Sequence, residues 1–189
     1  MLQRKTSPDS EARTPPAAAP GPAMPAVPEG MNPMIGVKLW HNPCRLSFRV
    51  NFIAHHFNQP IYDWIARNHH LTEPEHVVLY AIGLREGITA EDVAASSSRP
   101  RNTLSRAVNR LLGRKLIFRR HDAGDRRRRL LYLTGSGRAI LDETVPLLVA
   151  REEALTGSLS AEERETLNYL MTKVILNQAA WPTRIDRRD

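Results

Sequence analysis

The chain has 189 residues and carries 27 Lys and Arg against 20 Asp and Glu, a formal net charge of +7. This length supports one domain of ordinary size with tails. We find no run of 18 apolar residues and no apolar segment typical of a signal peptide, which argues against a membrane protein. Cys44 is the single cysteine, so the composition excludes an intrachain disulfide framework and favours a cytoplasmic location.

Both ends of the sequence have the composition of unstructured tails. Residues 1–33 are rich in Pro and Ala, and residues 181–189 are polar. Such segments bury too little apolar surface to offset their ordering entropy. We therefore expect a disordered tail over 1–33 and a frayed end over 181–189.

Residues 45–69 repeat apolar side chains at spacings of three and four, which predicts one long helix. Pro60 lies inside this pattern and is expected to kink or split the helix. A second stripe of aromatic and histidine side chains runs beside the first: Phe48, Phe52, His55, His56 and Tyr62. Two stripes on one helix predict two packing surfaces, one on its own domain and one on a partner subunit.

Three further helices are predicted before residue 114. A capping box beginning at Thr72 starts the first, which is expected to end near Gly87. Thr89 starts a short second helix. Pro100 fits the first turn of the third helix, whose apolar positions alternate with arginines.

A β-hairpin with a strongly basic tip is predicted next. Apolar segments over 116–118 and 130–134 flank a polar turn containing Asp and Gly. From Arg99 to Arg129 there are 12 Lys and Arg and two acids, a local net charge of +10, so the rest of the chain sums to −3. Such a concentrated patch is typical of nucleic-acid binding.

The remaining sequence predicts two helices that complete the fold. Thr134 caps one that runs to about residue 156 with Pro146 inside, and a capping box at Ser160 opens the last. The predicted fold is mainly α with a small β-hairpin, a winged helix-turn-helix flanked by long helices. Its predicted parts are an N-terminal dimerisation segment over 34–71, a DNA-binding domain over 72–134 and C-terminal dimerisation helices over 135–180. The flanking helices carry surplus apolar positions, so we expect a homodimer.

Several motifs together resemble those of the MarR family (multiple-antibiotic-resistance regulators). The matching segments, within residues 45–178, are Leu71-Thr72, Asn102 through Leu112, Asp125-Arg126-Arg127, Leu130-Leu131-Tyr132-Leu133-Thr134 with Gly137, and Leu159-Ser160 with Glu163. One position departs from the family pattern, because Lys115 stands where a glycine is usual. A left-handed conformation at Lys115 would cost about 1 kcal/mol.

The resemblance implies a sequence-specific transcriptional regulator, expected to be a dimeric repressor on a palindromic operator in double-stranded DNA. It implies neither an enzyme nor a cofactor. The N-terminal end of the recognition helix and the wing tip supply the candidate DNA contacts: Arg101, Asn102, Thr103, Ser105, Arg106, Arg126 and Arg127. Arg and Asn make bidentate contacts to bases, and helix N-termini favour phosphate. Asp125 is expected to support the wing by orienting an arginine.

The resemblance also implies a small anionic aromatic effector between the DNA-binding and dimerisation parts. The candidate ligand-binding residues lie on the long helix: Arg45, Phe48, Arg49, Phe52, His55, His56 and Tyr62. An aromatic wall with a few cationic groups suits an aromatic carboxylate. The alternative is that this stripe forms the core of the dimer.

Other functions stay open at this stage. A cluster of histidines (His55, His56, His69, His70 and His76, with Glu73 and Glu75 nearby) is compatible with a metal sensor, although its spacings match no zinc signature and we assign no metal site. Cys44 is compatible with a redox sensor. A metal-dependent enzyme lacks support from any Gly-rich phosphate loop, nucleophile elbow or HExxH motif. A protein that coats nucleic acid without sequence preference is a further alternative.

Overall fold

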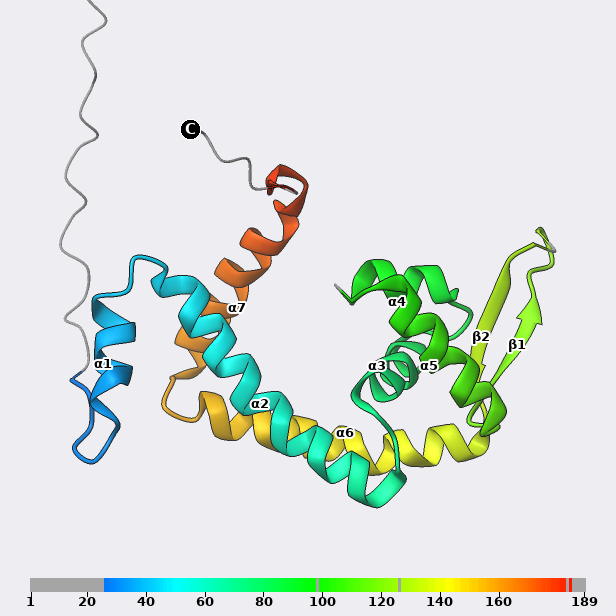
Figure 1. Ribbon diagram of the computed structural model, residues 1–189, viewed down its shortest axis with the longest axis horizontal. Helices are drawn as coiled ribbons and strands as arrows, with labels where there is room; N and C mark the ends of the chain where they lie inside the picture. The colour runs from blue at the N-terminus through cyan, green and yellow to red at the C-terminus, as the bar shows by residue number, and fades with distance from the viewer. Residues whose placement is uncertain (1–25, 98, 126, 183, 185–189) are drawn as a thin grey trace, which may run out of the picture. The chain divides into compact units, whose positions relative to one another are not determined.

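The computed structural model describes residues 26–97, 99–125, 127–182 and 184 (Figure 1). The chain divides into two compact units, Met1–Phe48 and Arg49–Asp189. Most of the predicted tail over 1–33 and of the predicted frayed end over 181–189 lies outside the described residues.

The first unit contains helix α1 (Pro33–Trp40) and the first turn of α2 (Arg45–His69). The sequence analysis did not predict α1, although its signals are present. The Asn32 Oδ1 atom accepts a hydrogen bond from the Met34 N–H at 2.9 Å, and Pro33 occupies the first helical position.

The helices of the second unit follow the predicted order (Figure 1): the rest of α2, then α3 (Glu73–Leu84), α4 (Ala90–Ser96) and α5 (Arg101–Gly113). The sequence predicted a kink or a split at Pro60; α2 is continuous through this residue, so the split does not occur. Capping boxes at Thr72 and Thr89 start α3 and α4 as predicted. Helix α3 ends at Leu84, before the predicted Gly87, because the chain beyond it turns to meet the hairpin.

The hairpin consists of β1 (Ile117–His121) and β2 (Arg129–Leu133), which pair antiparallel and confirm the predicted wing. After α3, Ile88 pairs with Leu131 of β2 as an isolated antiparallel bridge. The Leu131 N–H donates to the Ile88 carbonyl at 2.8 Å, and the Gly87 N–H donates to the Leu131 carbonyl at 2.9 Å. The wing is therefore joined to the end of α3 as well as to α5.

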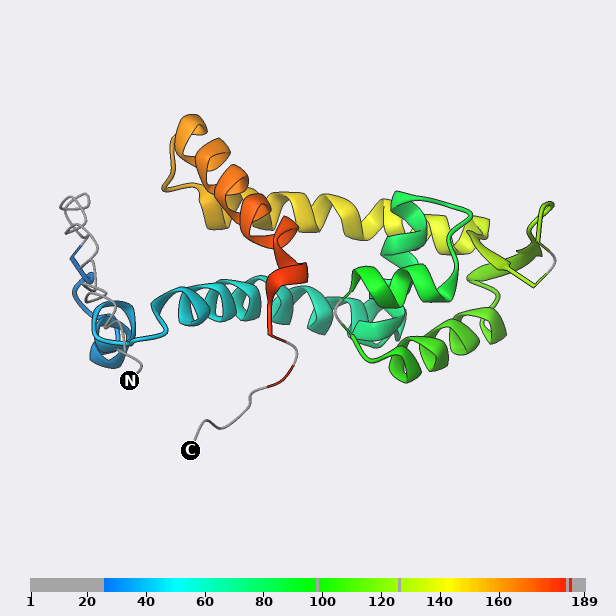
Figure 2. The ribbon, with the colours of Figure 1, turned by 90° about the horizontal axis from the view of Figure 1, so that it is seen from above.

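Helix α6 (Gly135–Thr156) and helix α7 (Ala161–Leu176) close the chain, followed by the 3₁₀ turn Gln178–Ala180. Their caps, Thr134 and Ser160, are the predicted ones. Helix α6 leaves the hairpin and packs against α3 (Figure 2). Within the described residues, no helix combines the length and apolar character needed to cross a membrane.

The core lies between α3, α4, α5 and the hairpin, with contributions from the C-terminal part of α2 and the first half of α6. Its fully buried side chains include Ile65, Leu79, Ile82, Leu104, Leu111, Ile117 and Leu131. Helix α7 contributes no buried residue. The architecture is the predicted winged helix-turn-helix, mainly α with one small hairpin, and its core holds α5 and the wing on one rigid support.

Candidate nucleic-acid interface

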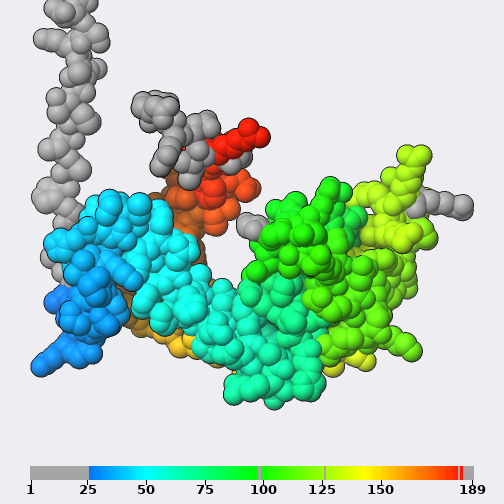
Figure 3. Space-filling view, viewed as in Figure 1, coloured from blue at the N-terminus to red at the C-terminus, as the bar shows by residue number. Residues whose placement is uncertain are grey.

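Helix α5 has one buried and one exposed face. Leu104, Ala107, Val108 and Leu111 recur at spacings of three and four and are fully buried. The predicted contacts Arg101, Asn102, Ser105 and Arg106 are exposed, and Thr103 is half-buried. Helix α5 contacts α4 and β1, and these elements lie side by side in the space-filling view (Figure 3). The core spacing thus turns the predicted contact residues outward.

The first turn of α5 is held by contacts within it and with α4. Pro100 stands at its N-cap and supplies no side-chain cap, and its carbonyl oxygen accepts from the Thr103 N–H at 3.0 Å. The Asn102 Oδ1 atom accepts from the Thr103 N–H at 2.8 Å. Arg101 forms an ion pair with Glu91 of α4, and both side chains are mostly exposed.

Arg119 joins the wing to α5. A terminal nitrogen of its guanidinium donates to the Asn109 Oδ1 atom at 3.1 Å. Burial and the nearby charge of Arg129 lower the pKa of Arg119. The next residue, Arg120, lies over the rings of Phe118 and Tyr132, 5.1 and 5.3 Å from their centroids. The Arg119 contact joins the wing to α5, and the Arg120 contacts join the two strands of the wing.

The wing tip is organised by two aspartates. The Asp122 Oδ1 atom accepts from the backbone N–H groups of Gly124 and Asp125 at 2.7 and 3.2 Å, which lowers the pKa of Asp122. The Asp125 Oδ1 atom accepts from the Arg127 N–H at 2.9 Å. Asp122 also lies 3.9 Å from Arg128. Sequence reasoning missed Asp122, although an Asp two residues before a Gly is a turn signal.

The contact of Asp125 differs from the one expected. The sequence predicted that Asp125 pairs with the side chain of an arginine, whereas its described partner is the backbone N–H of Arg127. Arg126 lies outside the described residues. Arg127 is exposed and, with Arg119, Arg128 and Arg129, lines a pocket of about 570 Å³ between the wing and the start of α4. Part of the predicted concentration of positive charge therefore lies on one side of the wing, where Glu91 and Asp92 face it.

A second pocket, of about 510 Å³, lies between α2, α3 and α6. Its lining is largely aromatic and aliphatic, with Phe57, Tyr62, His76, Tyr80, Leu148 and Glu152 among its residues. Burial and the nearby Glu73 raise the pKa of Tyr62, against the opposing effect of Arg99. Burial and the nearby His69 lower the pKa of His76 to about 4, so this imidazole is neutral at pH 7. Its Nε2 atom has no hydrogen-bond partner among the described residues.

The predicted ligand-binding residues all lie along α2. Arg45 and Phe48 belong to the first unit, and Arg49 begins the second. The ring of Phe52 stacks on that of His56 at 4.0 Å, with His55 edge-on to His56 at 5.6 Å. Tyr62 lines the second pocket instead. Over the described residues, no group of three or more His, Cys, Asp or Glu side chains is arranged to hold a metal, and Cys44 is exposed.

One family profile and several transcriptional regulators match the sequence of this chain. The sequence profile of the MarR family matches residues 69–128. The transcriptional regulator HosA of Escherichia coli O157:H7 is 34% identical over 119 residues, covering 63% of this chain and 88% of HosA. The transcriptional repressor NicR of Pseudomonas putida is 33% identical over 105 residues, covering 56% of this chain and 66% of NicR.

Solved structures with the same fold include two complexes with DNA. The DNA complex of Staphylococcus aureus MepR is 28% identical, with a TM-score of 0.59, and the match covers 69% of this chain and 94% of that one. A mutant MarR from Escherichia coli in complex with operator DNA is 25% identical, with a TM-score of 0.60, covering 72% and 97%.

Proposed function

The chain belongs to the MarR family of transcriptional regulators and binds DNA, and from this premise we propose that it is a homodimeric repressor of a palindromic operator. Each copy of α5 enters a major groove, and each wing reaches the adjacent minor groove. The observation that carries this proposal is the exposed face of α5 beside an arginine-rich wing, both fixed to one core. Arg101, Asn102, Thr103, Ser105 and Arg106 contact bases and phosphates from α5, and Arg126 and Arg127 contact DNA from the wing.

The apolar surface of α7 supports the dimer. This helix has no buried residue, yet it carries Leu167, Tyr169, Leu170, Val174, Ile175 and Leu176, each of which is at least 42% exposed on the single chain. Helix α6 adds the exposed side chains of Leu147, Val149 and Leu155. Exposed apolar side chains in this number mark an interface, and we propose that a second copy of the chain covers them. Light scattering at micromolar concentration tests this step, because a folded monomer would contradict it.

DNA binding is tested with a duplex that the protein selects from a random library, compared with a scrambled duplex of the same length. Arg127→Ala is expected to weaken binding and to lower the salt slope by about one, because a phosphate or minor-groove contact is lost. Arg67→Ala removes the same charge from the exposed side of α2 and is the matched control. Equal salt slopes for both variants would show that the wing does not contact DNA.

The base contacts are tested on single-base variants of the selected duplex. Asn102→Ala and Arg106→Gln are expected to change which base pairs matter, since a bidentate contact discriminates between bases by about 1–3 kcal/mol. If a variant lost the same amount of affinity for every duplex, the substituted residue would be a phosphate contact and not a base contact. A protein that binds selected and scrambled duplexes equally would be a coating protein.

The effector proposed for this regulator is a small aromatic acid bound in the pocket between α2, α3 and α6. The aromatic lining accommodates a ring. The carboxylate of the ligand would lie near the Tyr62 hydroxyl and Arg99, whose charge already acts on Tyr62. Arg99 also forms an ion pair with Glu73. Because Arg99 lies two residues before α5, a ligand that draws it away from Glu73 would move the start of the recognition helix.

Release of the selected duplex by benzoate, compared with neutral benzamide, tests the effector. Tyr62→Phe is expected to weaken the response to benzoate, and Phe52→Ala, on the α2 stripe outside the pocket, is expected to leave it unchanged. The reverse pattern would place the ligand on the stripe. Release by zinc or by peroxide, with no response to benzoate, would make the protein a metal or redox sensor.

A further inference from the structure

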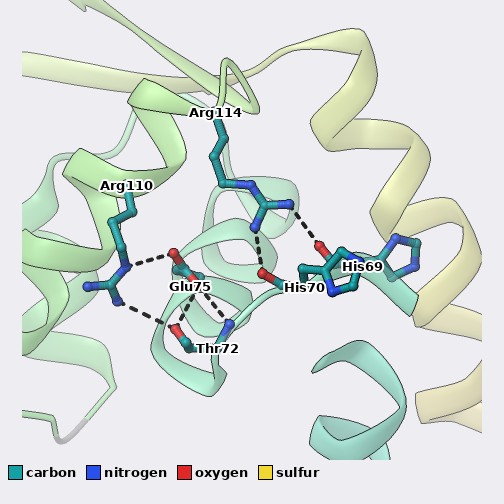
Figure 4. Close-up of polar contacts among 6 residues, drawn as sticks. All are labelled: His69, His70, Thr72, Glu75, Arg110 and Arg114. Carbon is teal, nitrogen blue, oxygen red and sulfur yellow. Dashed lines mark hydrogen bonds and ion pairs between the residues drawn. The ribbon is translucent and has the colours of Figure 1, made fainter. Parts of the chain in front are cut away.

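Arg110 in the last turn of α5 and Arg114 at its C-cap contact the segment that joins α2 to α3. Arg106, Arg110 and Arg114 are spaced by four residues, and each step of four adds about 40° of rotation around a helix of 3.6 residues per turn. Arg114 is therefore rotated by about 80° from Arg106. All three arginines are exposed. Arg106 lies on the proposed DNA-facing side, whereas the guanidinium groups of Arg110 and Arg114 reach the junction between α2 and α3 (Figure 4).

Arg114 caps the C-terminal end of α2. Its two terminal nitrogens donate to the carbonyl oxygens of His70 and His69 at 2.7 and 2.8 Å. Helix α2 ends because His70 adopts a left-handed backbone, with φ of 52°, and its N–H returns to the Ala66 carbonyl at 3.1 Å. The last carbonyls of a helix lack partners within it and carry partial negative charge, so a guanidinium fork suits both needs.

Arg110 holds the other side of the same junction. Its Nε atom lies 2.8 Å from the Glu75 Oε1 atom, and the Glu75 side chain is only 4% exposed. The second carboxylate oxygen of Glu75 accepts from the N–H and the hydroxyl of Thr72 at 2.6 and 2.7 Å. Burial opposes ionisation, but these donors and Arg110 hold the pKa of Glu75 below its ordinary value. One carboxylate thus both caps α3 and binds α5.

We propose that Arg110 and Arg114 are positioning residues for DNA recognition, which fix the direction of α5 to the end of α2 and the start of α3. We call this set of contacts the α5 anchor; it consists of Arg110, Arg114, Thr72, Glu75 and the carbonyls of His69 and His70. Neither arginine contacts DNA. The α5 anchor acts by holding the exposed face of α5 at the angle at which base contacts form, and it ties that angle to α2. This inference rests on the proposed reading of DNA by α5.

Binding titrations on the selected and the scrambled duplex, each at several salt concentrations, test the α5 anchor. Arg114→Gln and Arg110→Gln are expected to weaken binding to the selected duplex about tenfold, with unchanged binding to the scrambled duplex and an unchanged salt slope. Arg106→Gln is the matched control on the DNA-facing side. It is expected to weaken binding to the selected duplex more than binding to the scrambled duplex, and to lower the salt slope by about one.

Arg114→Lys separates charge from geometry. Lysine keeps the positive charge but cannot donate to two carbonyls as a fork, so this variant is expected to bind the selected duplex as weakly as Arg114→Gln. A phosphate contact would instead be restored by lysine. Thermal unfolding identifies any glutamine variant that does not fold at the assay temperature, and Arg114→Lys then decides.

Three results would overturn the α5 anchor: restored affinity in Arg114→Lys, a lowered salt slope in Arg114→Gln, or wild-type affinity for the selected duplex in both glutamine variants. Failure of the proposed function gives a different pattern. If Arg106→Gln binds both duplexes as the wild type does, α5 does not contact DNA.

Discussion

The Nε–H of Arg151 on α6 donates to the carbonyl oxygen of Phe57 on α2 at 2.8 Å, and the same guanidinium also donates to the carbonyl of His56. These carbonyls lie three and four residues before Pro60. Proline has no N–H, so the His56 carbonyl lacks the helical donor it would otherwise have, and the proline ring crowds this turn. Arg151 thus replaces the missing donor from a different helix, and α2 continues through Pro60 without a break.

A double-mutant cycle tests this compensation. Arg151→Gln alone is expected to destabilise the protein by about 1.5–3 kcal/mol, because carbonyls lose a charged donor. Pro60→Ala restores an N–H for the His56 carbonyl, so Arg151→Gln in that background is expected to cost at least 1 kcal/mol less, by the same estimate. Denaturant unfolding of the four proteins measures the coupling. Strictly additive effects would mean that Arg151 does not compensate for Pro60.

Gly137 is predicted to tolerate no side chain. A Cβ atom at this position would lie 2.1 Å from the carbonyl oxygen of Leu116, which already accepts the Thr134 N–H at 3.0 Å. Gly137→Ala must therefore shift the start of α6 away from β1, at a cost of roughly 2–3 kcal/mol. Gly135→Ala, where a Cβ meets nothing within 4 Å, is the matched control and is expected to change stability little. Similar melting temperatures for the two variants would contradict this explanation.

Lys115 occupies a position that suits glycine. Its φ is 58°, its N–H donates to the Leu112 carbonyl at 3.0 Å, and the Leu116 N–H donates to the Leu111 carbonyl at 3.0 Å. This is a Schellman motif that ends α5 with a left-handed lysine. Lys115→Gly is expected to stabilise the protein by roughly 0.5–1 kcal/mol, since relief of strain exceeds the added freedom of the unfolded chain. Lys115→Ala keeps the strain, and an equal gain in that variant would refute the prediction.

His76 is predicted to make stability depend on pH between about 6.5 and 4. Burial lowers its pKa to about 4, whereas the unfolded chain has the ordinary value of 6.5. In this range the unfolded state binds more protons, so stability falls as the pH falls, by at most ~3 kcal/mol. His76→Phe removes this contribution. Denaturant midpoints of both proteins from pH 7.5 to 4.5 test it, and parallel curves would show that His76 does not titrate as proposed.

Local signals accounted for most of the helical fold. The capping boxes at Thr72, Thr89 and Ser160 start helices where the sequence placed them, because a cap depends on residues three positions apart. The Lys115 departure left open either a left-handed lysine or a different turn, and the structure contains the left-handed lysine. The exposed face of α5 followed from the spacing of its buried leucines.

Contacts between distant segments were not predictable in this way. Nothing local indicates that Arg114 reaches the end of α2, 44 residues earlier in the chain, because that contact depends on how α5 packs. Helix α3 ends earlier than predicted because of another distant contact. Ile88, which follows this helix, pairs with Leu131 of β2. The sequence predicted that Tyr62 and Phe52 share one stripe of α2, yet Tyr62 lines a pocket whose other walls come from α3 and α6.

The division of α5 along its length bears on how such a regulator acquires a new target. Its first two turns carry the exposed polar side chains, the two arginines of the α5 anchor lie at its C-terminal end, and the core positions lie on the buried face. Substitutions at Asn102, Ser105 and Arg106 therefore leave the buried leucines and the anchoring arginines untouched. Operator preference can drift through single surface changes, each nearly neutral for folding, so new binding sequences are accessible without passing through an unstable intermediate.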